Sequence, residues 1–181
     1  MPNYISLLRG INVSGKNKIQ MVDLKALYVE LGFNHVETYI QSGNVVFQSP
    51  ITNVKTLCKK IEDKIQRTFN YSINVIVRTS QQMENIVKNN PYCVDEKKDK
   101  TKMHVTFLSD LGVVSNSNKI TAAISAPDEF HITKNEIYLY CPNGYGKSKL
   151  SNSFFEKQLA IAATTRNWRT VNKLMEMTKG D

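Results

Sequence analysis

Residues 10–17, with the sequence GINVSGKN, combine the residue types of a phosphate-binding loop. They match the pattern G-x-x-x-x-G-K between an expected strand and an expected helix, where backbone N–H groups can surround an anion and the lysine adds positive charge. Asn17 replaces the hydroxyl residue that would bind Mg²⁺, and a tight hairpin follows the helix in place of a parallel crossover. Asn12 also occupies the place of the middle glycine of a dinucleotide-binding loop. The segment therefore argues against an NTPase and leaves anion binding open.

A weaker echo of the same pattern lies at residues 141–148, CPNGYGKS. Cys141 stands where the first glycine belongs. We interpret this segment as an exposed turn with a solvated lysine.

Residues 164–170, TTRNWRT, hold the only tryptophan and two of the five arginines of the sequence. A helix N-terminus flanked by arginine can bind an anion. A structural interpretation is equally concrete: Asn167 caps the helix that follows, Trp168 fills the core, and the arginines bond carbonyls or acids. The sequence leaves both interpretations open.

Recognised catalytic constellations are missing from the sequence. It contains no H-E-x-x-H, no G-x-S-x-G and no motif that pairs a cysteine with a histidine. Its thiols and imidazoles are scattered, which predicts free cysteines, no metal site and no cofactor: Cys58, Cys93, Cys141, His35, His104 and His131. Whether the protein is an enzyme stays open, since distant residues can converge in the fold.

The composition is that of a globular protein with a basic surface. The 181 residues carry 24 Lys and Arg against 16 Asp and Glu, a formal net charge of +8, which invites a nucleic-acid interpretation. Nineteen of the cations are lysines, and those at 55, 59, 60 and 64 on one helix are attributed to solubility. No apolar run approaches the roughly 20 residues that span a bilayer. With no signal peptide recognised at the start, we predict a cytoplasmic protein that does not bind membranes.

Hydrophobic periodicity predicts a β-α-β-β-α-β order for the first half of the chain. The clearest helix covers 54–69, where an apolar stripe follows a cap at Thr52 or Asn53. A turn at 42–44 joins two strands as a hairpin. The order is the split βαβ arrangement of ferredoxin-like folds. The other expected elements are a helix over 21–31 and strands over 4–9, 36–41, 45–48 and 72–78.

The second half is less regular and resembles a rearranged second plait. Helices are expected over 81–88, 119–125, 153–160 and 168–177, and strands over 103–109, 130–133 and 136–141. We therefore predict an α+β fold of two ferredoxin-like (α/β-plait) halves, with antiparallel sheets and helices on one face. The predicted domains are residues 1–79 and 80–181.

Four motifs in order resemble those of a bacterial family: LLRGINV at 7–13, GKNK at 15–18, YIQSGNV at 39–45 and TTRNW at 164–168. Over residues 4–174 the chain is similar to the family called domain of unknown function 1697. The resemblance implies two α/β-plait domains, no established activity and no catalytic residues to transfer. It also implies that the loop at 10–17 is this family's own. Ser14 stands where the family usually has glycine, a departure expected to matter little if its φ is negative.

Nine polar residues in loops and at element ends form the predicted site: Arg9, Asn12, Lys16, Lys18, Ser42, Asn44, Arg166, Asn167 and Arg169. If the first loop, the hairpin turn and the start of the last helix meet, these residues form one basic polar pocket. Our leading hypothesis is that this pocket binds an anionic ligand, either a phosphorylated metabolite or nucleic acid. One alternative is an enzyme acting on a small metabolite. Another is that the motifs only stabilise the fold, with Gly10 and Gly43 in positive-φ turns.

Overall fold

The chain forms two compact units in the computed structural model, which describes residues 1–110 and 117–179. The first unit comprises Met1–Glu84 with Lys173–Asp181, and the second comprises Asn85–Asn172. The boundary therefore falls within two helices, α3 (Ser80–Lys88) and α6 (Trp168–Met177). The domain boundary between residues 79 and 80 stays a prediction.

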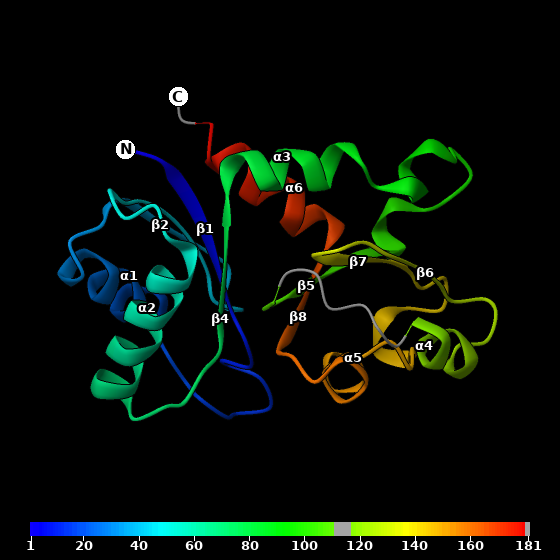
Figure 1. Ribbon diagram of the computed structural model, residues 1–181, viewed down its shortest axis with the longest axis horizontal. Coiled ribbons are helices and arrows are strands. Elements are labelled where there is room, and N and C mark those ends of the chain that lie inside the picture. Colours follow the sequence, from blue (N-terminus) through cyan, green and yellow to red (C-terminus); the bar gives the residue numbers. More distant parts are fainter. Residues whose placement is uncertain (111–116, 180–181) are drawn as a thin grey trace. The chain divides into compact units, whose positions relative to one another are not determined.

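The first unit is a four-stranded antiparallel sheet with two helices on one of its sides (Figure 1). The strands lie in the order β2-β3-β1-β4, which with the β-α-β-β-α-β chain order is the ferredoxin-like arrangement. The fold class expected from the sequence is confirmed here. The elements are β1 (Asn3–Leu8), α1 (Met21–Glu30), β2 (Asn34–Tyr39), β3 (Asn44–Gln48), α2 (Val54–Phe69) and β4 (Val75–Thr79).

The core of the first unit lies between the sheet and the two helices. Phe47 on β3 stands near its centre, with its ring centroid 4.6 Å from that of Phe33 and 5.4 Å from that of Tyr28. Helix α2 contributes an apolar stripe of Leu57, Ile61 and Ile65, all fully buried. Because the apolar residues of α2 occupy one stripe, its opposite side is left for polar and charged residues.

A side-chain cap explains where α2 begins. The Asn53 Oδ1 accepts a hydrogen bond from the Thr56 backbone N–H at 3.0 Å, so Asn53 and not Thr52 is the capping residue. At the other end Asn70 adopts the left-handed conformation, with φ of 58°, and stops the helix.

The second unit repeats the arrangement, with strand order β6-β7-β5-β8 and all neighbours antiparallel. Its core contains Leu139 of β7 and Phe155 of α5, both fully buried. The elements are β5 (Met103–Leu108), α4 (Ser117–Ala123), β6 (Glu129–Ile132), β7 (Glu136–Tyr140), α5 (Asn152–Leu159) and β8 (Ala163–Asn167).

Strand β8 is the element that the periodicity missed. Its sequence, ATTRN, looks polar, but threonine is β-branched and suits an edge strand. The hydroxyl of Thr165 is satisfied inside the unit, with its Oγ1 2.7 Å from the Thr106 Oγ1 and donating to the Asn152 Oδ1 at 2.6 Å. The predicted rearranged plait is therefore a complete second β-α-β-β-α-β unit.

The turn between β2 and β3 contains a glycine that no other residue can replace without strain. Gly43 has a φ of +76°, and a Cβ added there would lie 2.6 Å from the Ile11 Cδ1 and 2.9 Å from the Leu8 Cβ. Gly10 has a similar φ of +72°, but nothing lies within 4 Å of its added Cβ. The expectation that both glycines serve positive-φ turns is confirmed.

We expect Gly43→Ala to lower the free energy of unfolding by about 3 kcal/mol, roughly 1 kcal/mol from the positive φ and the remainder from the close contacts. Gly10→Ala is the matched control and should cost only about 1 kcal/mol, because it changes φ strain alone. Urea denaturation of both variants measures the difference. Equal losses would show that the space around residue 43 is not limiting.

Candidate functional site

Asn12 fastens the loop that follows β1. Its Nδ2 donates to the backbone oxygens of Ile19 and Gln41, at 2.8 Å each, and its Oδ1 accepts from the Ile19 N–H at 2.9 Å. Asn17 adds a bond from its Nδ2 to the Gly10 oxygen at 3.0 Å. Since Gln41 belongs to the β2–β3 turn, the side chain of Asn12 ties the loop to that turn.

The backbone of this loop is closed on itself and does not cradle an anion. The Asn12 N–H donates to the Asn17 oxygen at 3.2 Å, and the Lys16 N–H donates to the Val13 oxygen at 2.9 Å. Helix α1 begins only at Met21, so the G-K end of the motif does not open a helix. The loop therefore has the sequence pattern of a phosphate-binding loop but not the backbone geometry with which such loops bind phosphate.

Several residues of the loop have left-handed backbone conformations, which asparagine and glycine tolerate better than other residues. Asn12 has a φ of 53° and Asn17 a φ of 47°. Ser14 stands where the family usually has glycine, and its φ is 51°. The replacement would matter little only at a negative φ, whereas this φ lies in the region that favours glycine. Serine there costs roughly 1 kcal/mol of backbone strain.

The β2–β3 turn is closed by Asn44 and Ser42. Asn44 is fully buried, and its Nδ2 donates to the Tyr39 oxygen and to the Ser42 Oγ at 2.9 Å each. These bonds hold the turn in one conformation beside the loop. Two of the three predicted segments thus meet in the first unit, but the amides that we predicted would bind a ligand are bonded within the fold.

The third predicted segment belongs to the second unit. Arg166 is buried and donates from Nη1 to the Thr164 Oγ1 at 2.8 Å and to the Thr165 oxygen at 3.0 Å. The Asn167 Oδ1 accepts from the Thr170 N–H at 2.8 Å, so Asn167 caps α6 as the structural interpretation expected. Arg169 is exposed. That this segment joins the other two in one pocket stays a prediction.

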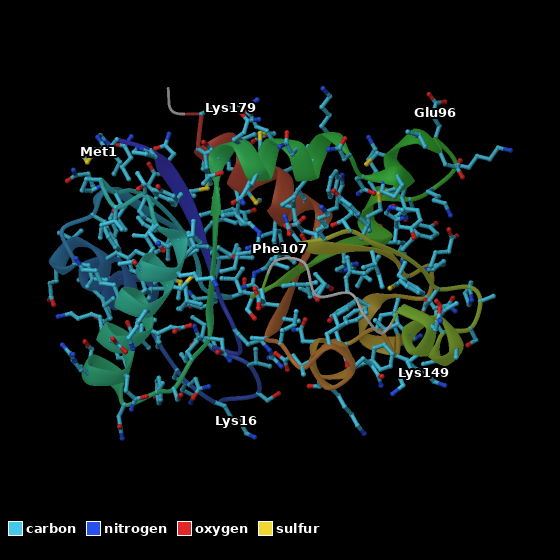
Figure 2. All side chains as sticks on the ribbon, viewed as in Figure 1. Met1, Lys16, Glu96, Phe107, Lys149 and Lys179 are labelled. Carbon is cyan, nitrogen blue, oxygen red and sulfur yellow. The ribbon has the colours of Figure 1, made fainter. Side chains whose placement is uncertain are left out.

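The remaining predicted residues lie on or near the loop. Figure 2 shows Lys16 on the outside of the loop, and both it and Lys18 are exposed. Arg9 is half-buried, with its backbone N–H bonded to the Asn74 oxygen at 2.9 Å. An open recess of about 700 Å³ beside the loop is lined by Lys18 and Asp23, so the formal charges of its lining sum to zero. The other residues of this loop recess are Asn12, Gly15, Ile19, Gln20, Gln41 and Phe69.

A second recess, of about 640 Å³, lies along the polar side of α2. Its charged residues are five cations and the single carboxylate of Asp63, so the charges sum to +5 − 1 = +4. We call the five cations the α2 basic face: Lys55, Lys59, Lys60, Lys64 and Arg67. Leu31, Asn53 and Thr56 complete the recess.

Contacts within the first unit position several of these cations. The Lys64 Nζ lies 2.7 Å from the Glu30 Oε2, and the Lys59 Nζ lies 3.4 Å from the Asp63 Oδ2. The Lys60 Nζ lies 5.7 Å from the ring centroid of Phe33. Exposed ion pairs stabilise a fold by at most about 1 kcal/mol, so the exposed Lys59 can exchange the Asp63 carboxylate for another anion at little cost, whereas Lys64 is half-buried against Glu30.

The sequence analysis attributed the four lysines of this helix to solubility, as charges on its solvated face. The spacing 55, 59, 60, 64 and 67 is visible in the sequence. At about 100° per residue Lys55, Lys59, Lys60 and Arg67 lie on the side of the helix opposite the apolar stripe, and Lys64 lies at the edge of that stripe, about 20° from Leu57. The missing information was that one recess holds all five, and only the fold supplies it.

The recess near the second G-K-S echo is smaller and less charged. Lys147 and Lys149 line about 340 Å³ together with Asn143, Ser125 and Asp128. The Ser148 Oγ accepts from the Leu150 N–H at 3.1 Å, so this hydroxyl stabilises the turn. Lys147 is exposed, as expected for a solvated turn.

Two groups with shifted pKa values bear on the enzyme alternative. Burial raises the pKa of Glu62, whose Oε1 accepts a hydrogen bond from the Val75 N–H at 2.8 Å. Burial lowers the pKa of His104, whose ring stacks on that of Tyr145 with centroids 4.9 Å apart. Glu62 thus fixes the start of β4, and burial accounts for both shifts without a catalytic role.

We expect Asn12→Gly to destabilise the first unit by about 2 kcal/mol more than Asn17→Gly, because three side-chain bonds are lost instead of one. Both positions have positive φ, so the change to glycine relieves the same backbone strain in the two variants. Urea denaturation measures each free energy of unfolding. If the two variants lost equal stability, Asn12 would not be the residue that ties the loop to the turn.

Within residues 1–110 and 117–179, no three His, Cys, Asp or Glu side chains gather closely enough to hold a metal ion. None of the helices in the same residues combines the length and the apolar composition that crossing a membrane requires.

Comparison with known proteins defines the fold and the family. No curated protein matches the chain. The solved structure of the conserved bacterial protein SP0830 from Streptococcus pneumoniae is similar, with a TM-score of 0.74 and 23% identity over 98% of each chain. At this identity the likeness concerns the fold alone. A family model described as "Protein of unknown function (DUF1697)" matches residues 1–138, and the chain therefore belongs to this family.

Proposed function

We propose that this protein binds an anionic ligand and that the α2 basic face is its binding surface. The observation that carries the proposal is the grouping of five cations and one carboxylate around a single recess of about 640 Å³. A concave surface on which one sign of charge predominates focuses the field and raises the local concentration of oppositely charged ligands. The cytoplasmic location expected from the sequence stays part of this proposal.

The predicted nine-residue site is the second candidate for the anion-binding surface. Lys18 supports it, because its exposed side chain lines the loop recess, and Lys16 is exposed on the same loop. Against it stand the internal bonds of Asn12 and Asn44 and the carboxylate of Asp23 in the loop recess. The two candidates lie on different elements of the first unit, so substitutions can distinguish them.

We expect the triple variant Lys55→Gln, Lys60→Gln and Arg67→Gln to bind inorganic polyphosphate about tenfold more weakly, since three surface charges are removed at low ionic strength. The matched control removes the same charge from the loop and from α1: Lys16→Gln, Lys18→Gln and Lys25→Gln. It should weaken binding by no more than about threefold. Isothermal titration calorimetry gives both dissociation constants.

The two triple variants carry the same net charge, so the comparison separates location from charge alone. A larger loss in the loop variant would move the site to the predicted loop. Equal losses would show that only net charge matters, and a wild-type protein that does not bind polyphosphate would end the proposal.

We expect Asp63→Asn to tighten polyphosphate binding by about two- to fivefold, because it removes the carboxylate that lines the recess and releases Lys59 from its ion pair. Asp23→Asn changes the net charge equally at the loop recess and should leave the affinity within about twofold. The same titration measures both. Since a gain of affinity cannot come from misfolding, an unchanged Asp63→Asn variant would count directly against the α2 basic face.

A further inference from the structure

We infer that the ligand of the α2 basic face is double-stranded nucleic acid, bound through the phosphates of both strands and not through its bases. This inference rests on the proposed function and names the ligand of the same surface. It follows from how the five cations are distributed around and along α2, and from which residue types they are.

The cations form two rows on the helix. At about 100° per residue, Lys55 and Lys59 lie close together, and Lys60, Lys64 and Arg67 form a second row about 120° away around the axis. Asp63 lies between the two rows. A helix is about 10–12 Å across with its side chains, which is close to the width of the major groove of a duplex. Two rows on its flanks therefore suit two phosphate chains, whereas a single strand offers one.

The rows of cations are also long enough to lie along several successive phosphates of a duplex. From Lys55 to Arg67 the rise is about 18 Å at 1.5 Å per residue, all within the uninterrupted helix α2. A duplex carries one negative charge per about 1.7 Å of its axis, so about ten phosphates lie along this span. A duplex is stiff over about 150 base pairs, so little ordering accompanies its contact with a straight helix.

The residue types indicate contact with phosphate and not with base edges. Four of the five cations are lysines, which act as point charges and lack the planar fork that arginine offers to guanine. The side chain of Asn53, an amide that could read adenine, is committed to the Thr56 N–H as the helix cap. Binding through this surface is therefore expected to be independent of sequence.

The surface lacks the feature that single-strand binding uses. Proteins that hold single strands stack bases on exposed aromatic rings. In the part of the chain that the structure describes, the lining of the α2 recess includes no aromatic side chain, and the ring of nearby Phe33 is only 4% exposed. On the face of the first unit's sheet that points away from its helices, the strand residues Ile5, Leu7 and Val46 are aliphatic, and the half-buried ring of Tyr39 lies out on the edge strand β2.

The test is fluorescence anisotropy with two labelled DNA duplexes of about 20 base pairs and unrelated sequence, one of their single strands, and inorganic polyphosphate as competitor, between about 50 and 200 mM salt. The two duplexes should bind within about threefold of each other, and the single strand about fivefold or more weakly. Five phosphate contacts predict a slope of log K against log salt of about −4.5. The triple variant Lys55→Gln, Lys60→Gln and Arg67→Gln should reduce the slope to about −1.8, and Asp63→Asn should tighten duplex binding.

The outcomes separate this inference from the proposed function. Polyphosphate binding that depends on the α2 basic face, with no duplex binding or with tighter binding of the single strand, would overturn the duplex and leave anion binding in place. Duplex binding whose salt slope is the same in the triple variant would place the duplex on another surface and overturn the inference. If neither polyphosphate nor duplex bound, both proposals would fail.

Discussion

The architecture of the first unit depends on one constraint: side-chain hydrogen bonds must hold the loop after β1 against the β2–β3 turn. Asn12 meets this constraint with three hydrogen bonds, two of which close the loop while the third reaches the turn. Asn44 closes the turn from within, and Gly43 leaves room for Ile11 beneath it. A buried polar group without partners is costly, so the fully buried amide of Asn44 is fixed by the fold before any ligand is considered.

Much of the fold could be predicted from the sequence because hydrophobic periodicity reports burial directly. Helix α2 and the β2–β3 hairpin follow from apolar spacing, a cap and a turn. Strand β8 was missed because Thr165 looks polar in a sequence but is satisfied by Thr106 and Asn152 in the fold. A polar edge strand has no apolar alternation, so its partners are known only once the sheet exists.

The candidate site was harder to predict than the fold because the same residue types can either bind a ligand or stabilise the backbone. An asparagine near glycines and lysines fits an anion-binding loop, and it fits equally well an amide that holds backbone carbonyls. The partners of Asn12 and Asn44 are main-chain oxygens, which every residue has and no sequence pattern marks. The cations of α2 are the opposite case. Their periodic spacing was visible, but which side chains share a recess with Lys60 depends on the end of α1 and on the whole of α2.

The motifs by which the chain resembles its family and the surface that we propose for binding are therefore under different constraints. LLRGINV and YIQSGNV contain Asn12, Gly43 and Asn44, whose substitution disturbs the packing of loop against turn. The α2 basic face lies on the solvent side of a helix, where most substitutions change stability by no more than about 0.5 kcal/mol. Substitutions on this face can therefore add or remove charged residues with little effect on the stability of the fold. In this chain the bonded loop and turn are therefore fixed by the packing of the first unit, whereas the cations on α2 are free to serve a ligand without disturbing it.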